Sequence, residues 1–78
     1  MNSSICSLSE LKRGQRAVID SFTDYDLSLK LLEMGCIPGE MIEVSRIAPL
    51  GDPIAISVSG YQLSMRKSEA ATIKVRPV

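Results

Sequence analysis

Hydrophobic and polar residues alternate with a period of two in the second half of the chain. Every second residue between positions 54 and 58 is a branched aliphatic one, and apolar residues alternate again between positions 61 and 65. The dipeptide Ser59-Gly60 between these segments suits a two-residue hairpin loop. A slip of one residue would turn every apolar side chain to the other face, so the pattern favours one register. The expected pairs are Val58–Tyr61, Ile56–Leu63 and Ile54–Met65.

Other segments of the chain also have strand character, because they are rich in β-favouring residues or alternate in polarity. These further strands are expected over residues 16–22, 41–47 and 71–76. Two prolines and a glycine make residues 48–53 a turn, since they cannot continue a ladder of hydrogen bonds. The total of five short strands favours a small barrel, which hides the strand edges.

One segment has helical periodicity instead. We expect Thr23 to cap this helix, with Asp26 completing a capping box and Asp24 favoured by the helix dipole. The apolar face then consists of residues at helical spacing, Leu27, Leu31, Leu32 and Met34.

The end of this helix is marked by Gly35, which can adopt the left-handed conformation. Pro38 then prevents the helix from resuming. We expect Cys36 and Ile37 to fold back over the last helical turn as small hydrophobic side chains.

Two connecting segments complete the predicted fold. Residues 1–9 are expected to be a loosely ordered lead-in, and residues 66–70 a single helical or 3₁₀ turn before the last strand. The whole chain, residues 1–78, is therefore predicted to be one mainly β domain. Its predicted architecture is an SH3-like five-stranded barrel with one α-helix inserted after the first strand.

Composition limits the classes of function. The chain has 78 residues, of which 45% are hydrophobic and only 4% aromatic, so we expect one domain with an aliphatic core. Nine basic and nine acidic residues cancel, which disfavours nucleic acid as a partner. The sequence shows neither a signal-peptide pattern nor a membrane-spanning stretch. We therefore expect a cytoplasmic protein that is not inserted in the membrane.

Catalytic chemistry has little support in the sequence. There is no histidine, which is the usual general base and the commonest metal ligand, and there are only two cysteines. The glycines do not form a phosphate-binding loop followed by Lys and Ser or Thr. We expect no enzyme activity, no catalytic residue and no cofactor.

Three sequence blocks carry a likeness to a known family. The segments Leu31–Glu40 (LLEMGCIPGE), Ala48–Ile54 (APLGDPI) and Tyr61–Ala70 (YQLSMRKSEA) resemble the signature segments of the FeoA family, in the same order and with the same spacing. Cys36 and Ile37 depart from the residues usual in that family. The resemblance implies a cytosolic partner of FeoB, the membrane permease that imports Fe²⁺ and carries a G-protein domain.

The FeoA resemblance raises the question of metal binding. Ferrous iron prefers imidazole, carboxylate or thiolate ligands that converge on one point. The sequence offers only scattered carboxylates and two distant thiols, so we expect no intrinsic metal site.

A partner-binding surface is therefore the main functional expectation. Our first hypothesis is an adaptor that contacts FeoB through the helix end, the 48–53 turn and a basic pair. The alternative is a metal-responsive regulatory module that binds a transcription regulator or a divalent metal, because the same module is appended to metal-dependent repressors. Edge strands also make self-association an open question. The candidate contact residues are Leu31, Met34, Gly35, Cys36, Pro38, Gly39, Pro49, Pro53, Arg66 and Lys67.

Overall fold

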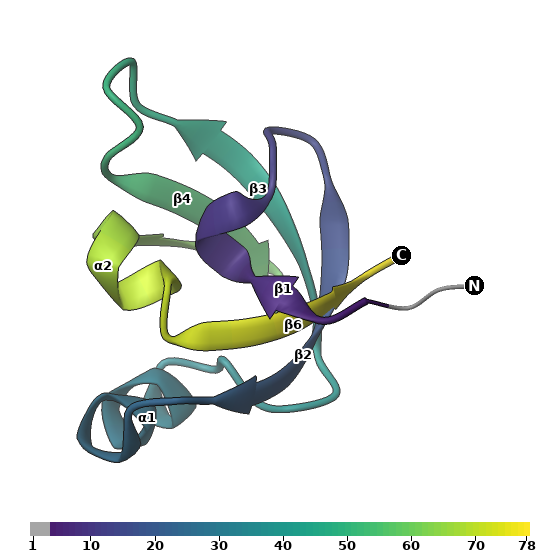
Figure 1. Cartoon of the computed structure of the whole chain (residues 1–78), viewed down its shortest axis with the longest axis vertical. Helices are drawn as coiled ribbons and strands as arrows, with labels where there is room; N and C mark the ends of the chain where they lie inside the picture. Colours follow the sequence, from purple (N-terminus) through teal and green to yellow (C-terminus); the bar gives the residue numbers. More distant parts are fainter. Residues whose placement is uncertain (1–3) are drawn as a thin grey trace.

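Across residues 4–78, which the computed structural model describes, six strands form one antiparallel sheet in the order β1-β6-β2-β3-β4-β5 (Figure 1). The mainly β fold class predicted from the sequence is confirmed, but with six strands in place of five. Along the chain the elements are β1 (Cys6–Ser7), the 3₁₀ helix η1 (Leu8–Glu10), β2 (Arg16–Phe22), α1 (Tyr25–Glu33), β3 (Met41–Ile47), β4 (Ile54–Val58), β5 (Tyr61–Met65), α2 (Lys67–Ala70) and β6 (Ile73–Pro77).

The hairpin of β4 and β5 has the predicted register. Ser59 and Gly60 both have positive φ, 50° and 83°, as a type I′ turn requires. The observed pairs confirm the sequence prediction: Val58 lies opposite Tyr61, Ile56 opposite Leu63, and Ile54 opposite Met65.

The core is aliphatic, as the composition predicts. Register shifts occur at Asp20 in β2 and at Ser45 in β3, and such bulges bend a strand and increase its twist. The curved sheet encloses side chains from most strands. Among the most deeply buried are Ile19, Ile42, Val44, Ile56, Ile73 and Val75.

The beginning of the chain differs from the loosely ordered lead-in expected over residues 1–9. Residues 1–3 lie outside the described residues. From Cys6 onward, β1 pairs with β6, and Leu8 is buried in the core with 1% of its surface exposed. A two-residue strand is too short to show a periodic pattern, so β1 cannot be recognised from the sequence alone.

The N-terminus of α1 lies one residue later than expected. Asp24, not Thr23, is the cap, because the Leu27 N–H donates to the Asp24 carboxylate at 3.0 Å. Thr23 is instead held beside β6, where its N–H donates to the Thr72 carbonyl at 2.9 Å. Asp26 lies in the first turn, where a negative charge suits the helix dipole. The cap moves because Thr23 still belongs to the backbone pairing that precedes the helix.

The segment before β6 is an α-helical turn, one of the two alternatives expected from the sequence. The Ala70 N–H donates to the Arg66 carbonyl at 3.0 Å, and the Ala71 N–H donates to the Lys67 carbonyl at 2.9 Å. Both bonds span four residues, which is the α-helical spacing.

The two helices and the last residue lie on opposite sides of the molecule. In Figure 1, α1 and α2 are on the left, and the chain ends on the right. Val78, the last residue, is 70% exposed, and its N–H donates to the Arg16 carbonyl at 3.1 Å.

Candidate partner-docking surface

The end of α1 is a Schellman motif. Gly35 has φ of +96°; its N–H donates to the Leu32 carbonyl at 3.1 Å, and the Cys36 N–H donates to the Leu31 carbonyl at 2.9 Å. These two bonds satisfy carbonyls that a helix end leaves free. The expected stop at Gly35 is therefore present, with Glu33 as the last residue of α1 and Met34 as its C-cap.

Two predicted contact residues at this helix end are inside the core. Leu31 is 2% exposed and Cys36 is fully buried. Burial also raises the pKa of the Cys36 thiol, so it stays protonated at neutral pH. These side chains hold the helix on the sheet and do not reach the surface. Ile37, expected to cover the helix end with Cys36, is instead 47% exposed.

Tyr61, at the start of β5, covers Gly35. A Cβ atom placed on Gly35 would collide with the Tyr61 hydroxyl and lie 3.4 Å from the ring carbon that bears it. Gly35 is therefore required both for its backbone conformation and for this close approach. Tyr61 was not among the predicted contact residues, although it opens the third sequence block. Its place at the start of that block was the only sign of Tyr61 in the sequence, and its contact with Gly35 arises only in the tertiary fold.

The 48–53 turn is fixed against α2. The Gly51 N–H donates to the Ala48 carbonyl at 2.7 Å, which closes the turn. The Asp52 carboxylate accepts a 2.9 Å hydrogen bond from the backbone N–H of Lys67. This bond satisfies one of the free N–H groups at the start of α2. This hydrogen bond brings together the turn and the basic pair, which are far apart in the sequence.

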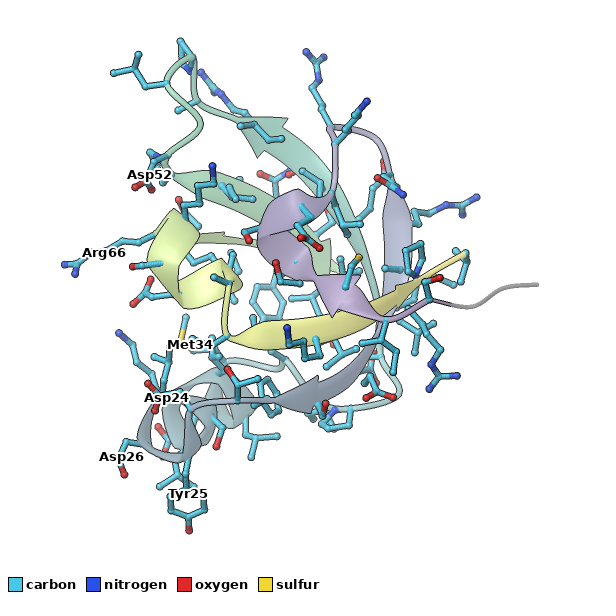
Figure 2. All side chains as sticks on the ribbon, in the orientation of Figure 1. Asp24, Tyr25, Asp26, Met34, Asp52 and Arg66 are labelled. Carbon is cyan, nitrogen blue, oxygen red and sulfur yellow. The ribbon has the colours of Figure 1, made fainter. Side chains whose placement is uncertain are left out.

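The two halves of this region are linked by β5. One half is the end of α1 with Tyr61, and the other is the 48–53 turn with α2. Figure 2 shows Asp52, Arg66 and Met34 along one side of the molecule. We call this region the candidate surface and define it by its accessible side chains: Met34, Pro38, Pro49, Leu50, Pro53, Tyr61, Arg66 and Lys67. Gly39 is also exposed beside Pro38.

The chemical character of the candidate surface is apolar with a cationic rim. Leu50 at the tip of the turn is 95% exposed and Tyr61 is 45% exposed. Arg66 and Lys67 form no ion pair within residues 4–78, where the recorded pair joins Arg76 to Asp20 at 3.2 Å. Exposed apolar side chains next to unpaired cations suit a protein partner with an apolar patch and acidic residues.

A cleft of about 330 Å³ lies under the 48–53 turn. It is open to solvent and includes polar groups from β3 and β5. No local sequence pattern groups the residues of this cleft, because they come from three strands and a turn. The lining residues are Arg46, Ala48, Pro53, Ala55, Gln62 and Ser64.

Metal-binding groups do not converge in the part of the chain that is described. Within residues 4–78, no three or more Cys, Asp or Glu side chains are grouped as metal ligands would be. Cys6 is half-buried, and its thiol pKa is raised by burial and by Glu10, with Lys74 acting in the opposite direction. Over the same residues, no helix is long and apolar enough to cross a bilayer.

The sequence as a whole matches one protein family. The family model described as the FeoA domain matches residues 6–77. This chain belongs to the FeoA family. The resemblance drawn from the three sequence blocks is therefore confirmed.

Solved structures of FeoA proteins have the same fold. A FeoA-like protein from Clostridium acetobutylicum is 33% identical with a TM-score of 0.89, covering 100% of this chain and 91% of that one. FeoA from Stenotrophomonas maltophilia, solved as a zinc complex, is 30% identical with a TM-score of 0.78, covering 88% of this chain and 87% of that one. The latter is described as a prokaryotic SH3 domain protein, which confirms the SH3-like fold expected here.

One relative joins a FeoA part to a transporter. The Fe(2+) transport protein A/Fe(2+) transporter FeoB fusion protein of Porphyromonas gingivalis is 41% identical over 69 residues. The match covers 87% of this chain but only 8% of that protein. FeoA and FeoB are therefore parts of a single polypeptide in that organism.

Proposed function

We propose that this protein is an accessory protein of bacterial ferrous iron uptake that docks onto the cytosolic part of a FeoB-type permease. The fusion protein of P. gingivalis carries this proposal, because it holds a FeoA part and FeoB in one chain. A domain joined covalently to a permease stays beside it, which favours a direct contact between the two. A role as an activating factor of ferrous iron transport has also been suggested for the S. maltophilia relative.

Docking takes place through the candidate surface. Leu50 supplies an exposed apolar tip, and the Arg66 and Lys67 side chains supply charge next to it. The hydrogen bond from Lys67 to Asp52 fixes the turn relative to α2, so these groups are presented without a large ordering cost. The protein acts by contact alone and changes either Fe²⁺ passage or GTP hydrolysis in its partner.

Calorimetric titration of this protein into the G-domain of its cognate permease tests the proposal. The titration is made with and without a GTP analogue and Fe²⁺. We expect saturable binding that Leu50→Asp and Arg66→Glu each weaken about tenfold or more, equivalent to about 1.4 kcal/mol. Arg13→Glu is the matched control, because Arg13 is an exposed cation outside the candidate surface and its loss should leave the affinity unchanged.

The proposal also makes a prediction for cells. A strain lacking only this protein should take up Fe²⁺ more slowly, and the Leu50→Asp variant should fail to restore the rate. Normal uptake in the deletion strain would contradict the proposal. So would a failure to bind both the G-domain and the intact permease.

A further inference from the structure

Strand β5 has an unpaired edge. It is the last strand of the sheet, and within residues 4–78 its one partner strand is β4. In a two-residue hairpin the pair next to the turn, Val58–Tyr61, is hydrogen-bonded, and hydrogen-bonded pairs alternate with open ones along the strands. Gln62 and Ser64 lie in open pairs, so their N–H and C=O groups point away from β4. Among residues 4–78 these four groups have no other hydrogen-bond partner.

The edge of β5 lacks the features that usually prevent pairing with another chain. Edge strands are commonly protected by charged residues, proline, bulges or very short length. The sequence of β5, Tyr-Gln-Leu-Ser-Met, has no charge and no proline, and its register with β4 is regular. At the other end of the sheet, β1 is only two residues long. The free edge of β5 is therefore the better template for an added strand.

We propose that β5 pairs with β5 of a second copy of this chain, antiparallel and about a two-fold axis at Leu63. In this register Gln62 of each copy lies opposite Ser64 of the other. The N–H and C=O of both residues are then satisfied, giving four hydrogen bonds between the copies. The edge can pair with a copy of itself, because the two residues with free backbone groups, Gln62 and Ser64, lie symmetrically on either side of Leu63.

Charge also favours a second copy in this register. Arg66 of one copy lies opposite Gly60 of the other, next to Ser59. The Ser59 hydroxyl lies 3.5 Å from the Glu40 carboxylate, so an acidic group is present at that end of the hairpin. Neither Glu40 nor Arg66 has an ion-pair partner within the described residues. The antiparallel arrangement brings the two opposite charges together twice.

The expected dimer is weak and reversible. Contact between two five-residue edges buries far less than the roughly 1,200 Å² that stable interfaces need. The protein should therefore be monomeric at low micromolar concentration and associate as concentration rises. This inference does not depend on the proposed contact with the permease, although the two surfaces share Arg66 and meet at Tyr61, the first residue of β5.

Two double variants test the register by sedimentation equilibrium over a range of concentrations. Gln62→Lys with Ser64→Lys places a lysine of one copy opposite a lysine of the other at both 62–64 pairs. This variant should weaken the dimer roughly tenfold or more. Gln62→Glu with Ser64→Lys places glutamate opposite lysine and should preserve or tighten it. Both residues are exposed, so both variants should have the melting temperature of the original chain within a few degrees.

Amide hydrogen exchange provides the second measurement. The Gln62 and Ser64 amides should become protected as the protein concentration rises, because they are the donors to the second copy. The Leu63 amide, already bonded to β4, should change little. The proposal is overturned if the protein remains monomeric at millimolar concentration, or if the two double variants associate equally. It is also overturned if the Gln62 and Ser64 amides gain protection only when the permease G-domain is added, which would assign the edge to that partner.

Discussion

The close approach of Tyr61 to Gly35 can be tested with a matched pair of glycine substitutions. Gly35 and Gly39 have almost the same φ, +96° and +95°. A Cβ on Gly39 would have no atom within 4 Å, whereas a Cβ on Gly35 would collide with the Tyr61 hydroxyl. Replacing each by alanine therefore separates the cost of the backbone conformation from the cost of the contact.

The magnitudes follow from these two contributions. The left-handed conformation costs a non-glycine residue about 1–2 kcal/mol, and Gly39→Ala should lower the free energy of unfolding by that amount. Gly35→Ala has the same cost plus that of displacing the phenol ring. Overpacking a core costs about 1–3 kcal/mol, and Tyr61 is 45% exposed, so the lower end applies. We expect a total of about 2–3 kcal/mol for Gly35→Ala.

Urea unfolding followed by far-UV circular dichroism measures these costs, since the chain has no tryptophan. Equal slopes of free energy against urea would show that the variants unfold to similar states. The contact is isolated by repeating Gly35→Ala in a Tyr61→Ser background, where the cost should fall to that of Gly39→Ala. Equal costs for Gly35→Ala and Gly39→Ala in the original chain would refute the reasoning, because the contact would then contribute nothing.

Four further predictions concern ionisation, thiol reactivity and capping. Burial raises the pKa of the Cys36 thiol, so at alkaline pH the folded state retains a proton that the unfolded chain loses. The free energy of unfolding should therefore fall as pH rises above about 8.5 and be unaffected by this thiol below about pH 8. The Cys36→Ala variant should lose this pH dependence. A thiol reagent at pH 8 should accordingly modify half-buried Cys6 much faster than Cys36, and equal rates would contradict the burial of Cys36. Asp24→Ala removes the α1 cap and should lower the free energy of unfolding by about 1 kcal/mol; Asp26→Ala, which removes no recorded hydrogen bond, should cost less than half as much. Asp52→Ala should lower the free energy of unfolding by about 1 kcal/mol and speed amide exchange at the first N–H of α2. Unchanged exchange at that amide would show that the hydrogen bond from Lys67 to Asp52 does not hold the helix.

Local patterns carried most of the fold prediction. The β4–β5 register was predictable because the alternation and the Ser59-Gly60 loop specify the same pairing. The helix stop at Gly35 was predictable because a glycine can end a helix in the left-handed conformation, and Pro38, three residues later, prevents the helix from continuing. β1 was not predictable, since its two residues form through pairing with the distant β6. The choice between Thr23 and Asp24 as cap also depended on tertiary contact, because both residue types make good caps.

The candidate surface was predictable only in part. A sequence block shows which residues belong together but not which of them are buried. Leu31 and Cys36 were therefore grouped with surface residues, although they pack in the core. The contacts of Tyr61 with Gly35 and of Asp52 with Lys67 join residues far apart in the chain. Such contacts follow from the curvature of the sheet, which no local pattern specifies.

The position of Val78 affects how this domain can be attached to another protein. The last residue lies on the side of the molecule away from α1 and α2 (Figure 1), so a flexible linker joined there would not cross the candidate surface. Tethering would make docking intramolecular, with an effective concentration that reaches the millimolar range for short linkers. A surface with only millimolar affinity could then be occupied about half of the time. The same weak contact between separate chains would depend on how much of each protein the cell makes.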